Sequence, residues 1–251
     1  MATAHYSAST ELPVGQLIAR WFVTGMAILM LATAVAGFAP AILNPAGRRG
    51  PISLLAAVHG LVFLVWLLLF LAQSLLVATG RVGSHRRLGF AGVVVLASMI
   101  PLGYITTITM LQRGYDLSGD QSRPGESLDL VSASVFNFAY WLTFSILAAC
   151  AIGFRRRPAI HKRLMLFANI QLMGAPIAHF MGHLNILTPL AIVMPFSFFL
   201  LCAVARDYFA EKRIHPLTMT LSIVMFVQQP IYGTLIGPSM AWHQIVARLI
   251  R

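Results

Sequence analysis

Long runs of hydrophobic residues, separated by short polar or basic stretches, cover most of this 251-residue chain. A helix needs roughly 20 mostly apolar residues to cross the hydrocarbon layer of a membrane. Lipid offers the backbone no hydrogen-bond partner, so runs of this length form helices. The pattern predicts an all-α integral membrane bundle of seven transmembrane helices, at residues 17–39, 54–79, 88–111, 131–153, 164–185, 188–209 and 217–236.

The last segment, residues 239–251, has a different pattern. Trp242, Val246 and Leu249 share one side at helical spacing, whereas Gln244 and Arg248 share the other. A short helix of this kind lies in the membrane interface and does not span the bilayer. We therefore expect one transmembrane domain, residues 1–251, that ends in an interfacial helix.

Three basic clusters that contain a histidine separate successive apolar runs. The histidines are His85, His161 and His215. Trp66 and Trp141 precede the first two of them at nearly the same distance. Matching marks on successive helix pairs indicate duplication, so the bundle is expected to consist of related helical hairpins.

Composition supports a membrane location and suggests an orientation. Residues of hydrophobic type make up 58% of the chain and charged residues 10%, against about 25% charged residues in soluble domains. The net charge of +11 lies in short clusters between apolar runs, so it predicts contact with a lipid bilayer and not with nucleic acid. Lys and Arg favour the cytoplasmic side, which places the N-terminus inside. The inner group is Arg20, Arg81, Arg86, Arg87, Arg155, Arg156, Arg157, Lys162, Arg163, Arg206, Lys212 and Arg213.

The acidic residues are few and lie away from the apolar runs. The longest loop, from Arg113 to Leu130, is expected outside, and it holds Asp116, Asp120, Glu126 and Asp129. All seven carboxylates fall in loops or at helix ends. The sequence therefore predicts no membrane-embedded carboxylate that could act as a general base, which disfavours a metal-dependent hydrolase.

Three further histidines fall inside predicted helices, where an imidazole is costly and usually functional. His179 and His183 are four residues apart and share a helix face. From their distances along the helices, His59 and His183 are expected at the same depth near the outer side. Pro176 precedes the pair and is expected to bend the helix.

These histidines fit several uses, which the sequence leaves open. A haem b needs two imidazoles, an apolar slot and cations near its propionates. His59 and His183, with His179 as the rival ligand, are candidates for an outer haem. His85 and His161 are candidates for an inner haem, with Arg86, Arg87 and Arg163 near its propionates. Alternatively, His59, His179 and His183 form a metal site with an open position for water. The remaining alternatives are a proton path and plain interhelical hydrogen bonding.

Two families resemble this arrangement. Residues 54–185 resemble the diheme transmembrane cytochrome b family, in which paired histidines hold one haem at each membrane face. This chain departs from that pattern, because it has no histidine on the predicted fourth helix and two on the fifth. A broader stretch, residues 55–215, resembles a group of uncharacterised bacterial polytopic membrane proteins. The shared marks are Gln73, a Gly-Arg…His-Arg-x-x-Gly loop (Gly80 to Gly89) and a His-Lys/Arg-x-Met loop (His161 to Met165).

The second resemblance implies a multi-pass protein of the bacterial plasma (inner) membrane and brings no activity with it. Three functions remain open at this point. The first is transmembrane electron transfer by haem b, with a quinone or other membrane subunits as partners. The second is a non-catalytic membrane subunit or carrier without a cofactor. The third is a histidine-metal membrane enzyme.

Overall fold

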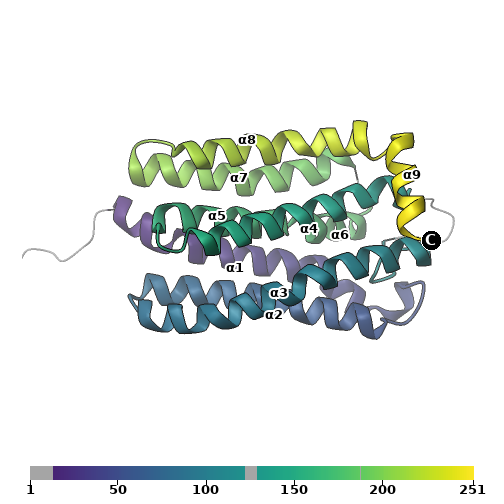
Figure 1. Ribbon diagram of the computed structural model, residues 1–251, viewed down its shortest axis with the longest axis horizontal. Helices are drawn as coiled ribbons and strands as arrows, with labels where there is room; N and C mark the ends of the chain where they lie inside the picture. The colour runs from purple at the N-terminus through teal and green to yellow at the C-terminus, as the bar shows by residue number, and fades with distance from the viewer. Residues whose placement is uncertain (1–13, 122–128, 187) are drawn as a thin grey trace, which may run out of the picture.

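The described part of the chain is an elongated bundle of roughly parallel helices without strands (Figure 1). The structure is a computed structural model and describes residues 14–121, 129–186 and 188–251. The helices are α1 (Val14–Leu43), α2 (Leu54–Ala78), α3 (Val82–Arg113), α4 (Leu130–Gly153), α5 (Pro158–Gln171), α6 (Gly174–His183), α7 (Pro189–Glu211), α8 (Pro216–Pro230) and α9 (Met240–Leu249), with a 3₁₀ turn at Pro45–Gly47 and a π turn at Ile231–Ile236.

Seven helical segments of the described chain are long and apolar enough to cross a membrane, as predicted. The third and fifth segments begin about six residues earlier than the hydropathy pattern indicates, at Val82 and Pro158. The first two turns of each of these segments carry basic side chains, which lower the mean hydropathy there without interrupting the helix. Pro158 suits the first position of a helix, because its missing N–H has no partner there in any case. As a result, His85 and His161 each lie in the first turn of a helix.

The fifth span is broken into α5 and α6 at Leu172 and Met173. Pro176 explains the break, because a proline ring clashes with the carbonyl four residues earlier and cannot donate to it; here that carbonyl belongs to Leu172. The break allows α6 to approach its neighbours closely. A Cβ at Gly37 of α1 would overlap the backbone of Pro176, and one at Gly174 would overlap the Tyr140 ring.

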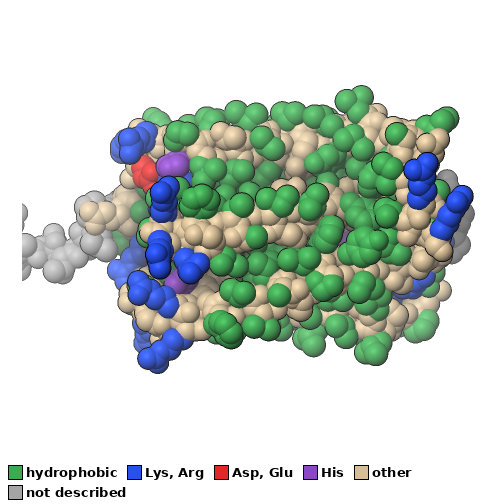
Figure 2. Space-filling model, viewed as in Figure 1, with side chains coloured by type: hydrophobic (Ala, Val, Ile, Leu, Met, Phe, Trp, Pro, Cys, Tyr) green, Lys and Arg blue, Asp and Glu red, His purple; other side chains and the backbone are tan. Residues whose placement is uncertain are grey.

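The two ends of the bundle differ in charge. Lys and Arg side chains gather at one end, while apolar side chains cover the sides that would face lipid (Figure 2). We call the first end the basic end; it carries the α2–α3, α4–α5 and α7–α8 turns. The opposite end carries the loop after α3, of which Glu126 lies outside the described residues. The gathering of cations at one end agrees with the charge pattern, and which end is cytoplasmic stays a prediction.

Helix α9 lies across the opposite end of the bundle (Figure 1). Trp242 Nε1 donates a hydrogen bond to the Val131 carbonyl at 2.8 Å, and Val246 is buried against Met110 and Leu111. The segment is therefore helical and amphipathic as predicted. Part of its apolar face packs on α3 and α4, while Ile245 and Leu249 remain exposed.

Candidate functional site

His85 and His161 face each other near the basic end. They lie on α3 and α5, and their ring centroids are 6.4 Å apart with an angle of 78° between the ring planes. Nδ1 of His161 lies 2.8 Å from the Ala151 carbonyl at the end of α4. A carbonyl only accepts hydrogen bonds, so Nδ1 is the donor in this contact, and Nε2 is the ring nitrogen that remains available to a ligand. A second hydrogen bond of this kind is the usual way to orient a histidine ligand.

The surroundings of His85 contain unpaired polar atoms. Nδ1 of His85 and Oε1 of Gln73 are both buried without a hydrogen-bond partner. Gly89 lies one turn after His85 and approaches the Gln73 amide. A Cβ at Gly92, one turn further on, would meet nothing within 4 Å. Buried unpaired polar atoms are rare in folded proteins and call for an explanation, so this face of α3 is a candidate for a missing ligand.

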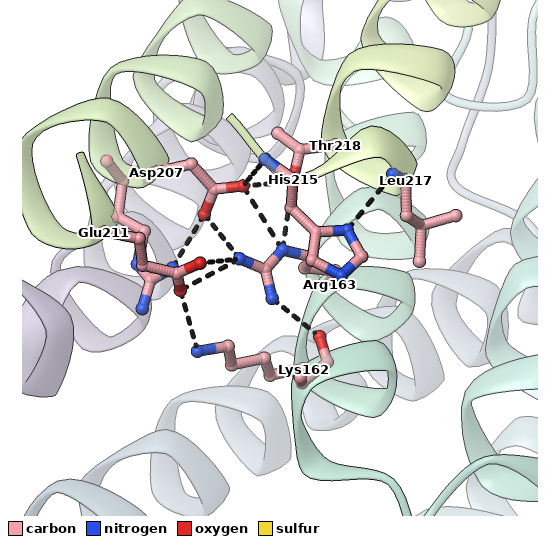
Figure 3. A network of polar contacts seen from close by, with 9 residues as sticks. Lys162, Arg163, Asp207, Glu211, His215, Leu217 and Thr218 are labelled. Carbon is pink, nitrogen blue, oxygen red and sulfur yellow. Dashed lines mark hydrogen bonds and ion pairs between the residues drawn. The ribbon is translucent and has the colours of Figure 1, made fainter. Parts of the chain in front are cut away.

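The cations predicted near this pair, Arg86, Arg87 and Arg163, have different surroundings. Arg86 and Arg87 are exposed beside His85. Arg163 is 4% exposed, and it points away into a network that joins α5, α7 and α8 (Figure 3). Its Nη2 donates to Asp207 Oδ1 at 2.8 Å and to Glu211, and its Nε lies 3.0 Å from Thr218 Oγ1. Arg163 is therefore committed to carboxylates, and only Arg86 and Arg87 remain for the predicted propionate contacts.

The network around Arg163 also includes the neighbouring charged residues of α5 and α7. Arg206 contacts Asp207 and Glu211, and Lys162 lies 3.7 Å from Glu211. The backbone N–H of His215 donates to Asp207 at 3.2 Å, and its ring accepts from Leu217 N as the cap of α8. The third basic-cluster histidine thus has a structural role. Because its charges satisfy one another, the network holds three helices together and offers no free ligand.

The structure separates His59 from the other two histidines at the opposite end. Nδ1 of His59 lies 3.4 Å from Thr106 Oγ1, and its ring stacks on Phe63 at 4.2 Å. His179 and His183 instead share a carboxylate, that of Asp120 in the loop after α3. The pairing of His59 with His183 across a haem therefore stays a prediction that these contacts do not support.

Asp120, His179 and His183 form a group whose ligand atoms all lie within 4.8 Å of one another. His183 Nε2 is 3.1 Å from Asp120 Oδ2, and His179 Nδ1 is 3.5 Å from Asp120 Oδ1. Nε2 of His183 also lies 3.2 Å from the Gly37 carbonyl. Among the described residues, this is the one group of three or more side chains arranged to hold a metal ion.

The sequence predicted both histidines of this group and missed the carboxylate. One feature of the sequence could have indicated this carboxylate. The acidic loop and the end of the helix that carries His179 and His183 were both expected on the outer side of the membrane. Asp120 lies in a loop, as predicted, but this loop packs on α6 and brings its carboxylate to both histidines.

A wide groove of about 400 Å³ also opens on the lipid-facing side, between α1, α6 and α7. Its walls are apolar apart from Thr33, and they include Leu29, Phe180 and Phe198. With no titratable group in it, the groove offers no site for chemistry. The two candidate binding sites are therefore the His85–His161 pair and the group of Asp120, His179 and His183.

Comparisons with protein-family models, curated proteins and solved structures found no match. The argument for function therefore depends on the two sites themselves.

Proposed function

We propose that this polytopic membrane protein binds haem b between His85 and His161 and transfers electrons through it. The spacing of the two imidazoles is the observation that carries the proposal. A metal–imidazole bond is about 2 Å long and the ring centre lies about 1 Å beyond the nitrogen, so two imidazoles that held one iron between them would have centroids roughly 6 Å apart. The 6.4 Å separation of the two rings agrees with this value.

The number of ligands also favours haem over a bare metal ion. A structural or catalytic zinc site takes three or four protein ligands. The described residues add no Cys, Asp, Glu or further His to the His85–His161 pair. Haem brings four nitrogens of its own, so two imidazoles from the protein would suffice to hold it.

The hairpin repeat explains why the pair meets. His85 and His161 are each the fourth residue of the second helix in a hairpin, α2–α3 and α4–α5. When two such hairpins pack side by side at the same depth in the membrane, their equivalent residues lie at the same height along the bundle. In this proposal the first two basic clusters each supply one ligand of the same group, whereas the third, at His215, belongs to the Arg163 network.

The chain's own residues have defined tasks in this proposal. The Ala151 carbonyl holds His161 with Nε2 free, and Arg86 and Arg87 supply cations for the propionates. Bound haem would supply one-electron redox chemistry, with a potential set by its axial ligands and burial. A quinone in the bilayer or another membrane subunit is the expected electron partner.

The test is an absorption spectrum of the detergent-purified protein, oxidised and reduced. We expect a Soret band that shifts on reduction and a narrow α band, with one haem per chain. His85→Ala and His161→Ala should each lose the low-spin spectrum while eluting as folded protein on size exclusion. His215→Asn is the matched control at the same end, because asparagine also caps a helix and the residue lies outside the pair.

Two outcomes would contradict the proposal. One is a wild-type protein that contains no haem and binds none when haemin is added. The other is loss of haem from His59→Ala or His183→Ala with His85→Ala intact, which would move the cofactor to the outer histidines.

A further inference from the structure

We propose a second, independent site at the opposite end of the bundle: Asp120, His179 and His183 bind a first-row divalent transition-metal ion, zinc or iron(II). This site does not depend on the haem proposal, because it shares no residue with the His85–His161 pair. It brings together one carboxylate from the loop after α3 and two imidazoles from one face of α6.

The distances suit a shared ion. Zinc lies about 2.0–2.2 Å from imidazole nitrogen and carboxylate oxygen, so ligand atoms around it are roughly 3–3.5 Å apart. The two measured separations, 3.1 Å for His183 Nε2 to Asp120 Oδ2 and 3.5 Å for His179 Nδ1 to Asp120 Oδ1, fall in that range. The four-residue spacing of the histidines places both on the same face of α6.

Several polar atoms of the group lack a well-formed hydrogen bond. The Asp120 side chain is only 5% exposed, and its two oxygens meet the imidazoles of His179 and His183 without a hydrogen bond of good geometry. Nδ1 of His179 is likewise buried without such a bond. A buried carboxylate without well-formed hydrogen bonds is costly, and a cation between the three side chains would lower that cost. Nε2 of His183 would exchange its contact with the Gly37 carbonyl for the ion.

The loop that carries Asp120 is built to hold it in place. Asp116 is buried, and its carboxylate accepts hydrogen bonds from Ser118 Oγ and from the backbone N–H groups of Gly119, Asp120 and Gln121. Gly119 takes a left-handed conformation, with φ of 79°, which favours glycine. These bonds direct Asp120 toward α6 before any ion binds.

The loop is also tied directly to α6 between the two histidines. The Gln121 side-chain amide donates to the His179 carbonyl at 3.3 Å. A Cβ at Gly182 would overlap that amide, so a larger residue there would require the Gln121 side chain to shift. The Phe38 ring of α1 lies against the His179 ring, with centroids 4.6 Å apart and the planes tilted by 51°, and limits its rotation. Ligands held by such neighbours are typical of real metal sites.

The donor set selects the class of ion. Two imidazoles and one carboxylate suit zinc and iron(II), whereas calcium and magnesium prefer oxygen ligands alone. Three protein ligands leave at least one position open for water or substrate, as in catalytic metal sites. His183 is 23% exposed, so that position is accessible from the aqueous side.

The experiment uses full-length protein in detergent, stripped with a chelator and then titrated with zinc alone. Isothermal titration calorimetry should give one ion per chain, and cobalt(II) should produce the visible d–d bands of a low-coordinate site. Asp120→Asn and His183→Gln should each weaken zinc binding at least tenfold. Asp120→Glu, which keeps the carboxylate, should retain the cobalt bands with altered intensity.

His243→Gln is the matched control. His243 lies at the same end and also pairs with a carboxylate, Asp129, at 3.8 Å, but without a second imidazole. Its substitution should leave zinc binding unchanged. Absence of stoichiometric zinc in the stripped and reloaded wild type, or equal affinity in Asp120→Asn and wild type, would overturn the site whatever the haem content.

Discussion

At the residue scale, the buried charges at the basic end show how a membrane helix accommodates arginine. Arg163 and Asp207 are 4% and 2% exposed, and they meet through paired hydrogen bonds (Figure 3). Thr218 also donates to Asp207, at 2.6 Å. Breaking such a pair leaves one buried charge without a counterion, which costs more than the pair contributes when intact.

We therefore expect Asp207→Asn to lower the stability of the protein strongly. The variant keeps the shape of the side chain but leaves Arg163 and Arg206 short of a carboxylate, so we expect a loss of about 3–5 kcal/mol in unfolding free energy. Thermal unfolding in detergent, followed by circular dichroism, measures it. Glu211→Gln is the control, since its side chain is 29% exposed and water can replace its contacts. Equal effects of the two substitutions would contradict this account of the network.

At the element scale, the approach of α1 to α6 depends on single glycines. Gly37 and Gly25 lie on the same helix, but their surroundings differ. A Cβ at Gly37 would overlap the Pro176 backbone, whereas one at Gly25 would meet nothing within 4 Å. Small residues of this kind let membrane helices pack backbone to backbone.

The two glycines give a matched pair of substitutions. Gly37→Ala should destabilise the bundle by about 1–3 kcal/mol, because the overlapping atoms are backbone and cannot move aside. Gly25→Ala should be neutral or stabilise by up to about 1 kcal/mol, as expected from helix propensity. The midpoints of thermal unfolding, measured side by side, test this. A Gly37→Ala protein as stable as Gly25→Ala would show that α1 and α6 are further apart.

The existence of the helices and most of their starts were predictable from the sequence, but the starts of α3 and α5 were not. Lipid requires every backbone group to be paired, so an apolar run of sufficient length forms a helix. The first turns of α3 and α5 escaped the pattern because Arg86, Arg87 and Lys162 lower their hydropathy. The meeting of His85 with His161 follows from the repeat. Asp120 could not be placed, because its position depends on four hydrogen bonds to Asp116 within an irregular loop.

At the scale of the whole molecule, the charge difference between the two ends predicts orientation. The positive-inside bias places the basic end in the cytoplasm. The proposed haem would then lie near the cytoplasmic side, and the proposed metal site would open to the periplasm. The two sites would therefore serve separate compartments.

Cysteine labelling in intact cells tests the orientation. In a background with Cys150→Ala and Cys202→Ala, a cysteine replacing Ser84 at the basic end should resist a membrane-impermeant thiol reagent. A cysteine replacing Ala46, which is exposed at the opposite end, should react. Permeabilised cells provide the control, in which both positions should be labelled. The reverse pattern in intact cells would invert the topology and exchange the compartments of the two sites.

The burial of the fifth span has a consequence for biogenesis. In an 18-residue apolar window of this span, Pro158–His183, 61% of the residues are buried, against 33% or less in the corresponding windows of the other described spans. It also carries Arg163, Asn169 and Gln171, whose partners lie on α2, α7 and α8. When the ribosome has made only the first five spans, the counterions of Arg163 have not yet been synthesised. The nascent fifth span is therefore poorly suited to leave the translocon for lipid, and we expect it to be held there until the α7–α8 hairpin emerges.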